Sequence, residues 1–121
     1  MERIPEAEQA VLDVLWAEAP LSATQITERV APRRGWSLQT VKTLLSRLVA
    51  REAVAYQAEG RAFLYRPAVS REAVATVESR RLLDRLFGGR AAPLVAHLAE
   101  RQALSPEDVA EIEAIIARLK K

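Results

Sequence analysis

The residues whose types and spacing best suit chemistry lie between Ser37 and Arg51, in the stretch SLQTVKTLLSRLVAR. At about 100° per residue, one helical side of this stretch carries the apolar side chains, and the opposite side carries hydroxyls, an amide and positive charge. The stretch contains the basic residues Lys42, Arg47 and Arg51 and no carboxylate. Because an ordinary solvated helix mixes both signs of charge, this face predicts contact with a polyanion.

The centre of the polar side is suited to the edges of base pairs. A glutamine amide can pair with adenine, an arginine can pair with guanine, and a threonine methyl can contact the methyl group of thymine. Lysine and arginine at the margins suit phosphates, which set the register of a protein on DNA. The competing interpretation is a solvated helix that happens to lack acids. The predicted DNA-binding residues of this helix are Ser37, Gln39, Thr40, Lys42, Thr43, Ser46 and Arg47.

Three further arginines flank this helix in the sequence. Arg33 and Arg34 precede it and could clamp a phosphate, whereas Arg61 stands beside a predicted hairpin turn that could meet the DNA backbone or minor groove. For each of the three, an ordinary solvated residue is an equally good interpretation. The charge distribution favours a polyanion-facing surface here, because residues 33–66 hold seven basic and two acidic side chains while residues 1–32 hold two basic and six acidic ones.

The sequence offers little for catalysis or metal binding. It has no cysteine, and its one histidine, His97, lies between apolar neighbours. Disulfides, thiolate sites and histidine-based zinc sites are therefore excluded. A Gly-rich phosphate loop and a nucleophile elbow are also missing. We predict no catalytic residue, no metal and no cofactor, and hence a protein that is not an enzyme.

The chain has the size and composition of a small globular protein. Its 121 residues, 50% of them hydrophobic, fit one small domain or a domain with an appendage. No apolar run approaches the roughly 20 residues that span a bilayer. The acidic start MERIPEAEQ does not resemble a signal peptide. We expect a cytoplasmic protein without a membrane partner.

Three predicted helices place the polar face. Pro5 suits the first turn of a helix that stops before Pro20. Ser22 is predicted to cap a second helix that Pro32 closes, and Ser37 is predicted to cap the third. The second and third helices together would form a helix-turn-helix.

A predicted hairpin follows these helices. The segment VAYQAEGRAFLYRP holds two short runs of strand-forming residues around a Glu59-Gly60 turn, and Pro67 ends the second run. Three helices followed by a hairpin is the order of a winged helix, with the hairpin as the wing. The aromatic residues predicted to lie in the core are Trp16, Trp36, Tyr56, Phe63 and Tyr65.

The chain returns to helix after Pro67. Ser70 is predicted to cap a helix that ends at Gly88 and Gly89, and Ser105 is predicted to cap the last helix. About fifty residues cannot bury such wide apolar helix faces alone. A two-fold partner would cover them and hold two recognition helices one DNA turn apart, or a multiple of it. The predicted dimerisation residues are Leu82, Leu83, Leu86, Phe87, Leu94, Leu98, Ile112, Ile115, Ile116 and Leu119.

The segments TVKTLLSRL, EGRAFLYRP and LFGG stand in an order and spacing that resemble a known family. That family is the BlaI/MecI/CopY group of penicillinase-type transcriptional repressors, and the opening EAEQAVLDVLWAEAPLSATQI resembles its first two helices. The resemblance covers nearly the whole chain. It implies a mainly α fold with a small β-hairpin: a winged helix-turn-helix DNA-binding domain in residues 1–69 and a helical dimerisation region in residues 70–121.

The resemblance also implies a function. It implies a sequence-specific repressor that binds a dyad operator in double-stranded DNA as a homodimer. Carried over from the family, the recognition-helix residues are Thr40, Lys42, Thr43, Ser46 and Arg47, with Arg61 on the wing. The copper-responsive branch has a Cys-rich motif, which this chain lacks, so the BlaI/MecI-like branch fits. Two alternatives stay open: a winged-helix module that binds protein and never DNA, and a DNA-binding activator.

In penicillinase-type relatives, induction involves proteolytic cutting within the C-terminal region. The matching segment here is FGGRAAPLV, from Phe87 to Val95, whose glycines and proline suit an accessible, extended chain. Those relatives are cut at an Asn-Phe bond, which this loop does not contain. The glycines are also fully explained as a helix C-cap, and we favour that interpretation. The operator sequence, the inducer and an inducing protease of unknown identity are left open.

Overall fold

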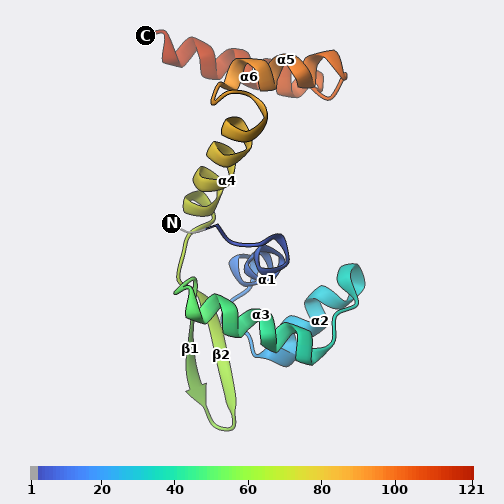
Figure 1. The fold of residues 1–121 in the computed structure, drawn as a ribbon, viewed down its shortest axis with the longest axis vertical. Coiled ribbons are helices and arrows are strands. Elements are labelled where there is room, and N and C mark those ends of the chain that lie inside the picture. The colour runs from blue at the N-terminus through green and yellow to red at the C-terminus, as the bar shows by residue number, and fades with distance from the viewer. Residues whose placement is uncertain (1–2) are drawn as a thin grey trace. The chain divides into compact units, whose positions relative to one another are not determined.

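The computed structural model describes residues 3–121, which form six helices and a two-stranded antiparallel hairpin (Figure 1). The elements are α1 (Glu6–Ala17), α2 (Ala23–Arg34), α3 (Leu38–Ala50), β1 (Val54–Glu59), β2 (Ala62–Pro67), α4 (Arg71–Leu86), α5 (Ala91–Glu100) and α6 (Pro106–Leu119). This order confirms the predicted mainly helical fold with a winged helix-turn-helix. The chain forms two compact units, Met1–Glu78 and Ser79–Lys121.

The core of the first unit lies between α1, α2 and α3, because each helix turns one apolar stripe inward. The stripes have the spacing that the sequence predicts, and the side chains at their centres are removed from water. The buried apolar residues of these helices are Val11, Leu12, Leu15, Ile26, Val30, Val41, Leu44, Leu45 and Leu48.

Hydroxyl caps fix the starts of α2 and α3, as predicted. The Ser22 side chain accepts a hydrogen bond from the Gln25 backbone N–H, and the Gln25 side chain accepts one from the Ser22 backbone N–H. Ser37 caps α3 by accepting a hydrogen bond from the Thr40 backbone N–H at 3.2 Å. These local bonds satisfy donors that a helix start would otherwise leave unpaired. The polar face of α3 therefore begins at a defined residue.

The end of α2 differs from the prediction. Pro32 does not close the helix, which continues to Arg34 and ends at Gly35, where φ is 64°. A proline in the last turn removes one backbone donor, and its own φ already suits a helix. Gly35 supplies the left-handed cap, and its N–H donates to the Ala31 carbonyl at 2.9 Å. Arg33 and Arg34 consequently belong to α2 and not to a loop.

The hairpin turn lies one residue later than predicted. Glu59 pairs with Ala62, so the two turn residues are Gly60 and Arg61 and not Glu59 and Gly60. Gly60 has a φ of 62°, a value that glycine adopts without strain. Arg61 therefore occupies the tip of the wing.

A short bridge attaches the wing to the helices. Leu21, just before α2, donates its N–H to the Tyr65 carbonyl at 3.1 Å, and the Tyr65 N–H donates to the Leu21 carbonyl at 2.8 Å. These two bonds make β2 the middle of three adjacent extended segments. The base of the wing is thereby held beside the start of α2.

The aromatic residues of the wing divide into two groups. Tyr65 packs against the core, as do Trp16 and Trp36, in agreement with the prediction. Tyr56 and Phe63 do not, since they are 52% and 51% exposed. The prediction was wrong for these two because Tyr56 lies on β1, the strand away from Leu21, and Phe63 lies nearer the turn than Tyr65. Both side chains therefore stay largely in water.

The first unit includes the start of α4. Val74 is buried at 5% exposure, the Arg71 guanidinium lies 4.9 Å from the centre of the Trp16 ring, and Gln9 Nε2 donates to Glu78 Oε1 at 3.1 Å. These contacts tie the start of α4 to the first compact unit, which extends to Glu78. The functional boundary at 69/70 stays a prediction.

The second unit is formed by helices with little interior of their own. Among the described residues, α5 and α6 contain no buried side chain. Gly88 and Gly89 have φ values of 59° and 78°, and the Gly89 N–H donates to the Leu83 carbonyl at 2.8 Å, which is the predicted helix C-cap. Ser105 caps α6 through a reciprocal pair of bonds with Asp108. No helix within residues 3–121 is long and apolar enough to cross a membrane.

Candidate nucleic-acid interface

The polar face of α3 is fully available for contact. Its buried stripe holds the helix against α1 and α2, and this fixes which side chains point outward. All seven residues predicted for this helix are exposed, and so are the three flanking arginines. The exposed set is Ser37, Gln39, Thr40, Lys42, Thr43, Ser46, Arg47, Arg33, Arg34 and Arg61.

Hydroxyl groups on this face are partly engaged by the helix itself. The Ser37 hydroxyl donates to the Thr40 hydroxyl at 3.2 Å, and the Thr43 hydroxyl donates to the Gln39 carbonyl at 3.0 Å. A hydroxyl that donates its proton still offers oxygen lone pairs. Thr43 can therefore accept a hydrogen bond from a base, and its methyl group can meet an apolar base edge.

Three cations around this face have no partner among residues 3–121. The side chains of Lys42, Arg47 and Arg61 form no ion pair and no hydrogen bond with any described residue, whereas the side chains of other arginines of the same unit do. An exposed cation without an internal partner loses no existing contact when it meets a phosphate. The side chains of these three residues are thus exposed cations that are available to a polyanion.

A hollow of about 310 Å³ joins two of these cations to the start of α2. Lys42 from α3 and Arg61 from the wing tip both line it. The residues Ser22 to Thr24 form another wall, so the positive end of the α2 dipole adds to the two side-chain charges. The hollow has the electrostatics of a phosphate-binding position.

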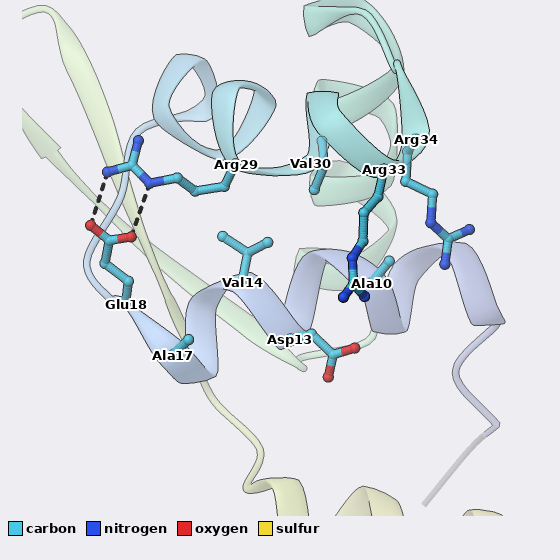
Figure 2. A pocket seen from close by; sticks show the side chains of 9 residues that line it. All are labelled: Ala10, Asp13, Val14, Ala17, Glu18, Arg29, Val30, Arg33 and Arg34. Atoms are coloured by element: carbon cyan, nitrogen blue, oxygen red, sulfur yellow. Dashed lines mark hydrogen bonds and ion pairs between the residues drawn. The ribbon is translucent and has the colours of Figure 1, made fainter.

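Arg33 and Arg34 lie on another side of the first unit. Both extend from the last turn of α2 toward α1 and line a hollow of about 350 Å³ between these helices (Figure 2). Arg34 is ion-paired with Glu6, and its guanidinium lies 5.1 Å from the centre of the Trp36 ring. The hydrogen bond from Arg34 lowers the pKa of the Glu6 carboxyl and, reciprocally, that bond raises the pKa of Arg34.

The same hollow is lined by an ion pair that joins α2 to Glu18, the residue after α1. Arg29 donates two hydrogen bonds of 2.9 Å to the Glu18 carboxylate (Figure 2). The bond from Arg29 lowers the pKa of Glu18. Arg33 and Arg34 are therefore grouped with residues that join α1 to α2, and the structure does not bring them to the face of α3 that carries Lys42 and Ser46.

Arg51 also has a structural position. It follows the last residue of α3, and its Nε donates to Oε1 of the buried Glu8 at 2.8 Å. It was counted with Lys42 and Arg47 in the positive charge of this helix. The structure separates it from them by directing it at α1.

Two aromatic residues that border α3 were predicted to lie in the core. Tyr56 and Phe63 stand half exposed beside Ser46 and Val49 of α3, around a hollow of about 280 Å³. The alternation of side chains along the hairpin, of which only one end is covered by helices, was the sequence signal that could have indicated their exposure. Beside them, burial raises the pKa of the Tyr65 phenol.

The predicted dimerisation residues share one property. None of the ten is buried within the chain, although all are apolar: Leu82, Leu83, Phe87, Leu94, Leu98 and Ile112 are half-buried, and Leu86, Ile115, Ile116 and Leu119 are exposed. The Phe87 ring lies 6.0 Å from the His97 ring. Within residues 3–121 no group of three or more His, Asp or Glu side chains could hold a metal ion.

The helix-turn-helix, the wing and the exposed cationic face of α3 define a winged helix-turn-helix protein. The family model described as penicillinase repressor matches residues 4–118. The chain therefore belongs to the penicillinase repressor family, as the sequence resemblance predicted.

Similar proteins and structures agree with this family. The chain is 28% identical to the penicillinase repressor of Bacillus licheniformis over 99% of this chain and 96% of that protein. It is 26% identical to the methicillin resistance regulatory protein MecI of Mammaliicoccus sciuri over 93% of this chain and 92% of that protein. The solution structure of monomeric Bacillus licheniformis BlaI in complex with the blaP half-operator matches with a TM-score of 0.51 and 28% identity, over 59% of this chain and 87% of that one.

Proposed function

We propose that this protein is a transcriptional repressor that binds a dyad DNA operator as a homodimer, without enzymatic activity. One observation carries the proposal. The outward face of α3 presents Gln39, Thr43 and Ser46 between the unpaired cations Lys42 and Arg47, with no carboxylate on the helix. This combination suits base edges at its centre and phosphates at its margins. Its relative BlaI, solved with a half-operator, supports the same role for this chain.

We assign the interface residues by their surroundings. Gln39, Thr43 and Ser46 are placed at base edges, with Ser37 and Thr40 at the helix start. Lys42 and Arg61 share a hollow with the α2 N-terminus and are assigned to phosphate. Arg33 and Arg34 are assigned only a secondary electrostatic role, since they face α1.

The apolar surface of residues 70–121 supports the proposed homodimer. The ten dimerisation residues are apolar, and none is buried within the chain. A second copy would cover these side chains through a two-fold interface. Two linked copies of α3 could then meet two half-sites, which raises the affinity for a dyad operator far above that of one copy. A repressor of bacterial operators acts in the cytoplasm, where the chromosome lies.

The test is selection of bound duplexes from a random DNA pool. We expect enrichment of a dyad whose half-sites are centred about 10 base pairs apart or a multiple of that. The rival interpretation is a winged-helix module that binds only protein. It predicts no enrichment and no gel shift with random DNA, even at low salt. A reporter gene placed behind the recovered site separates a repressor from an activator by the sign of its response.

A further inference from the structure

We propose that the Tyr56–Phe63 ring pair on the wing is an additional, apolar DNA-contact site that binds deoxyribose and thymine methyl surfaces next to the base edges that α3 reads. This inference rests on the proposed DNA-binding function and adds a contact to it. The two rings lie 5.1 Å apart between centres and at 74° to each other, so they form one edge-to-face unit. The two residues are 52% and 51% exposed, so about half of each residue's surface is free for a partner.

The position of the pair connects it to α3. In the hairpin register Tyr56 pairs with Tyr65, and Phe63 lies two residues before Tyr65, so all three side chains share one face. That face borders a hollow of about 280 Å³ whose other wall is formed by Ser46 and Val49 of α3. Ser46 belongs to the proposed base-reading set. A duplex that meets Ser46 therefore passes beside the ring pair.

The charges around the rings favour a polyanion over a protein partner. Phe63 also lines the adjoining hollow that contains Lys42 and Arg61, the two cations that we assign to phosphate. The hairpin carries one acid, Glu59, opposite Ala62. Phosphates attracted to Lys42 and Arg61 would bring the sugars between them onto the rings. Deoxyribose and thymine methyls are the apolar surfaces of a duplex, and phenylalanine is a suitable partner for them.

The ring pair is not explained by folding alone. Tyr65 of the same face packs against the core, but Tyr56 and Phe63 extend beyond it. An exposed aromatic pair costs solubility, because it presents apolar surface to water. A site whose apolar surface is covered only when DNA binds accounts for both the exposure and the position.

The experiment measures duplex affinity by fluorescence anisotropy, with the duplex recovered from the random pool, over a range of salt concentrations. We expect Tyr56→Ala and Phe63→Ala each to weaken binding about tenfold, because each ring buries apolar surface on DNA. The slope of log Kd against log salt should not change. Arg61→Ala should instead reduce that slope by about one per protomer. Phe63→Leu should give intermediate affinity, and Tyr56→Phe should bind normally. Gln57→Ala, on the other face of the hairpin, is the matched control.

Several results would overturn the inference. The first is a normal duplex affinity of the Tyr56→Ala/Phe63→Ala double variant. The second is a loss of affinity in Tyr56→Phe that is as large as in Tyr56→Ala, which would assign the contact to the hydroxyl group and not to the ring. A changed sedimentation coefficient of the double variant would show that the rings contact a second copy. Thermal unfolding of each variant separates a folding defect from a lost contact, and Phe63→Leu keeps the test open if Phe63→Ala does not fold. If the unmodified protein binds no duplex, the proposed function and this inference both fail; if it binds and the ring variants bind equally well, only this inference fails.

Discussion

The Nε atom of Arg51 lies 2.8 Å from Oε1 of Glu8 and joins the end of α3 to the inner side of α1. The Glu8 side chain is 2% exposed, and the Arg51 side chain is 27% exposed. Arg51 also donates to the Arg3 carbonyl at 3.1 Å. A carboxylate this deeply buried requires its partner, since an unpaired buried charge is strongly unfavourable. The ion pair therefore holds the recognition helix in place, although neither residue faces DNA in our assignment.

We expect Arg51→Met to lower the free energy of unfolding by about 2–4 kcal/mol, because it leaves the Glu8 carboxylate buried without its partner. Glu8→Gln should cost less, since it removes the charge and keeps the volume. The double variant should be more stable than the sum of the two single effects predicts. Urea unfolding of all four proteins measures this. Additive effects, within about 0.5 kcal/mol, would contradict a coupled pair.

The sequence predicted the helix positions well because the information is local. Ser22, Ser37 and Ser105 each cap a helix by accepting a hydrogen bond from the backbone N–H of the residue three positions on. A window of a few residues contains that signal. The apolar periodicity of α1 to α3 likewise identified the core.

What the sequence did not predict depends on contacts between distant residues. Pro32 is tolerated because α2 ends only at Gly35, and the start of α4 joins the first unit because Val74 packs into its core. Similarly, nothing local distinguishes Arg51, which pairs with Glu8 from another helix, from Arg47, which has no partner among residues 3–121. The charge pattern of the sequence therefore predicted where the positive surface lies. The role of each single arginine could be assigned only from the folded structure.

We expect Lys42→Ala and Arg47→Ala to weaken operator binding without unfolding the protein, because both residues are exposed and lie off the buried stripe of α3. A lost base contact should cost about 1–3 kcal/mol, and a lost phosphate contact should lower the salt slope by about one. Electrophoretic titration at several salt concentrations distinguishes the two cases. Arg118→Ala removes an exposed charge from α6 and serves as the control. Unchanged affinity in both α3 variants would remove this helix from the interface.

The extent of the first unit leads to a comparison of two fragments. A fragment ending at Glu78 should fold as a monomer. Its unfolding temperature should be higher than that of a fragment ending at Val69. The shorter one lacks Val74, the Arg71 contact with Trp16 and the Gln9–Glu78 hydrogen bond. Thermal unfolding followed by circular dichroism compares them, and sedimentation gives their mass. Equal stability of the two fragments would place the domain boundary at 69/70. A dimeric fragment would show that the first unit, and not the helices after it, forms the dimer interface.

The ion pairs that Arg34 and Arg29 of α2 form with Glu6 and Glu18 should make the free energy of unfolding depend on pH in the acidic range. Hydrogen bonds from Arg34 and Arg29 lower the pKa of Glu6 and Glu18 below the usual 4.5. Each carboxyl is charged in the folded state at a lower pH than in the unfolded state. The resulting stability is fully present above about pH 5 and is lost as the pH falls through the lowered folded pKa. The effect should be small, because these groups are exposed to solvent.

Glu6→Gln/Glu18→Gln should therefore flatten the pH dependence. We expect the unfolding temperature of the variant to fall less than that of the unmodified protein between about pH 6 and pH 3. Glu111→Gln, which removes an exposed carboxyl of α6 that has no ion pair within residues 3–121, is the control. Parallel curves for the double variant and the unmodified protein would show that the two ion pairs contribute nothing in solution.

The apolar face of α6 provides the sharpest test of the dimer. Ile116 is 45% exposed within the chain, and Ala114 lies on the opposite side of the same helix. We expect Ile116→Asp to make the protein monomeric at micromolar concentration, because a second copy would have to bury the new carboxylate without a partner. Ala114→Asp adds the same charge and should leave the dimer intact. Sedimentation equilibrium measures both. The monomeric variant should keep its affinity for a single half-site and lose a factor of about 10²–10⁴ on the full dyad, since the second half-site no longer benefits from a linked copy. An Ile116→Asp protein that remains dimeric, with full affinity for the dyad, would mean that α6 does not form the interface.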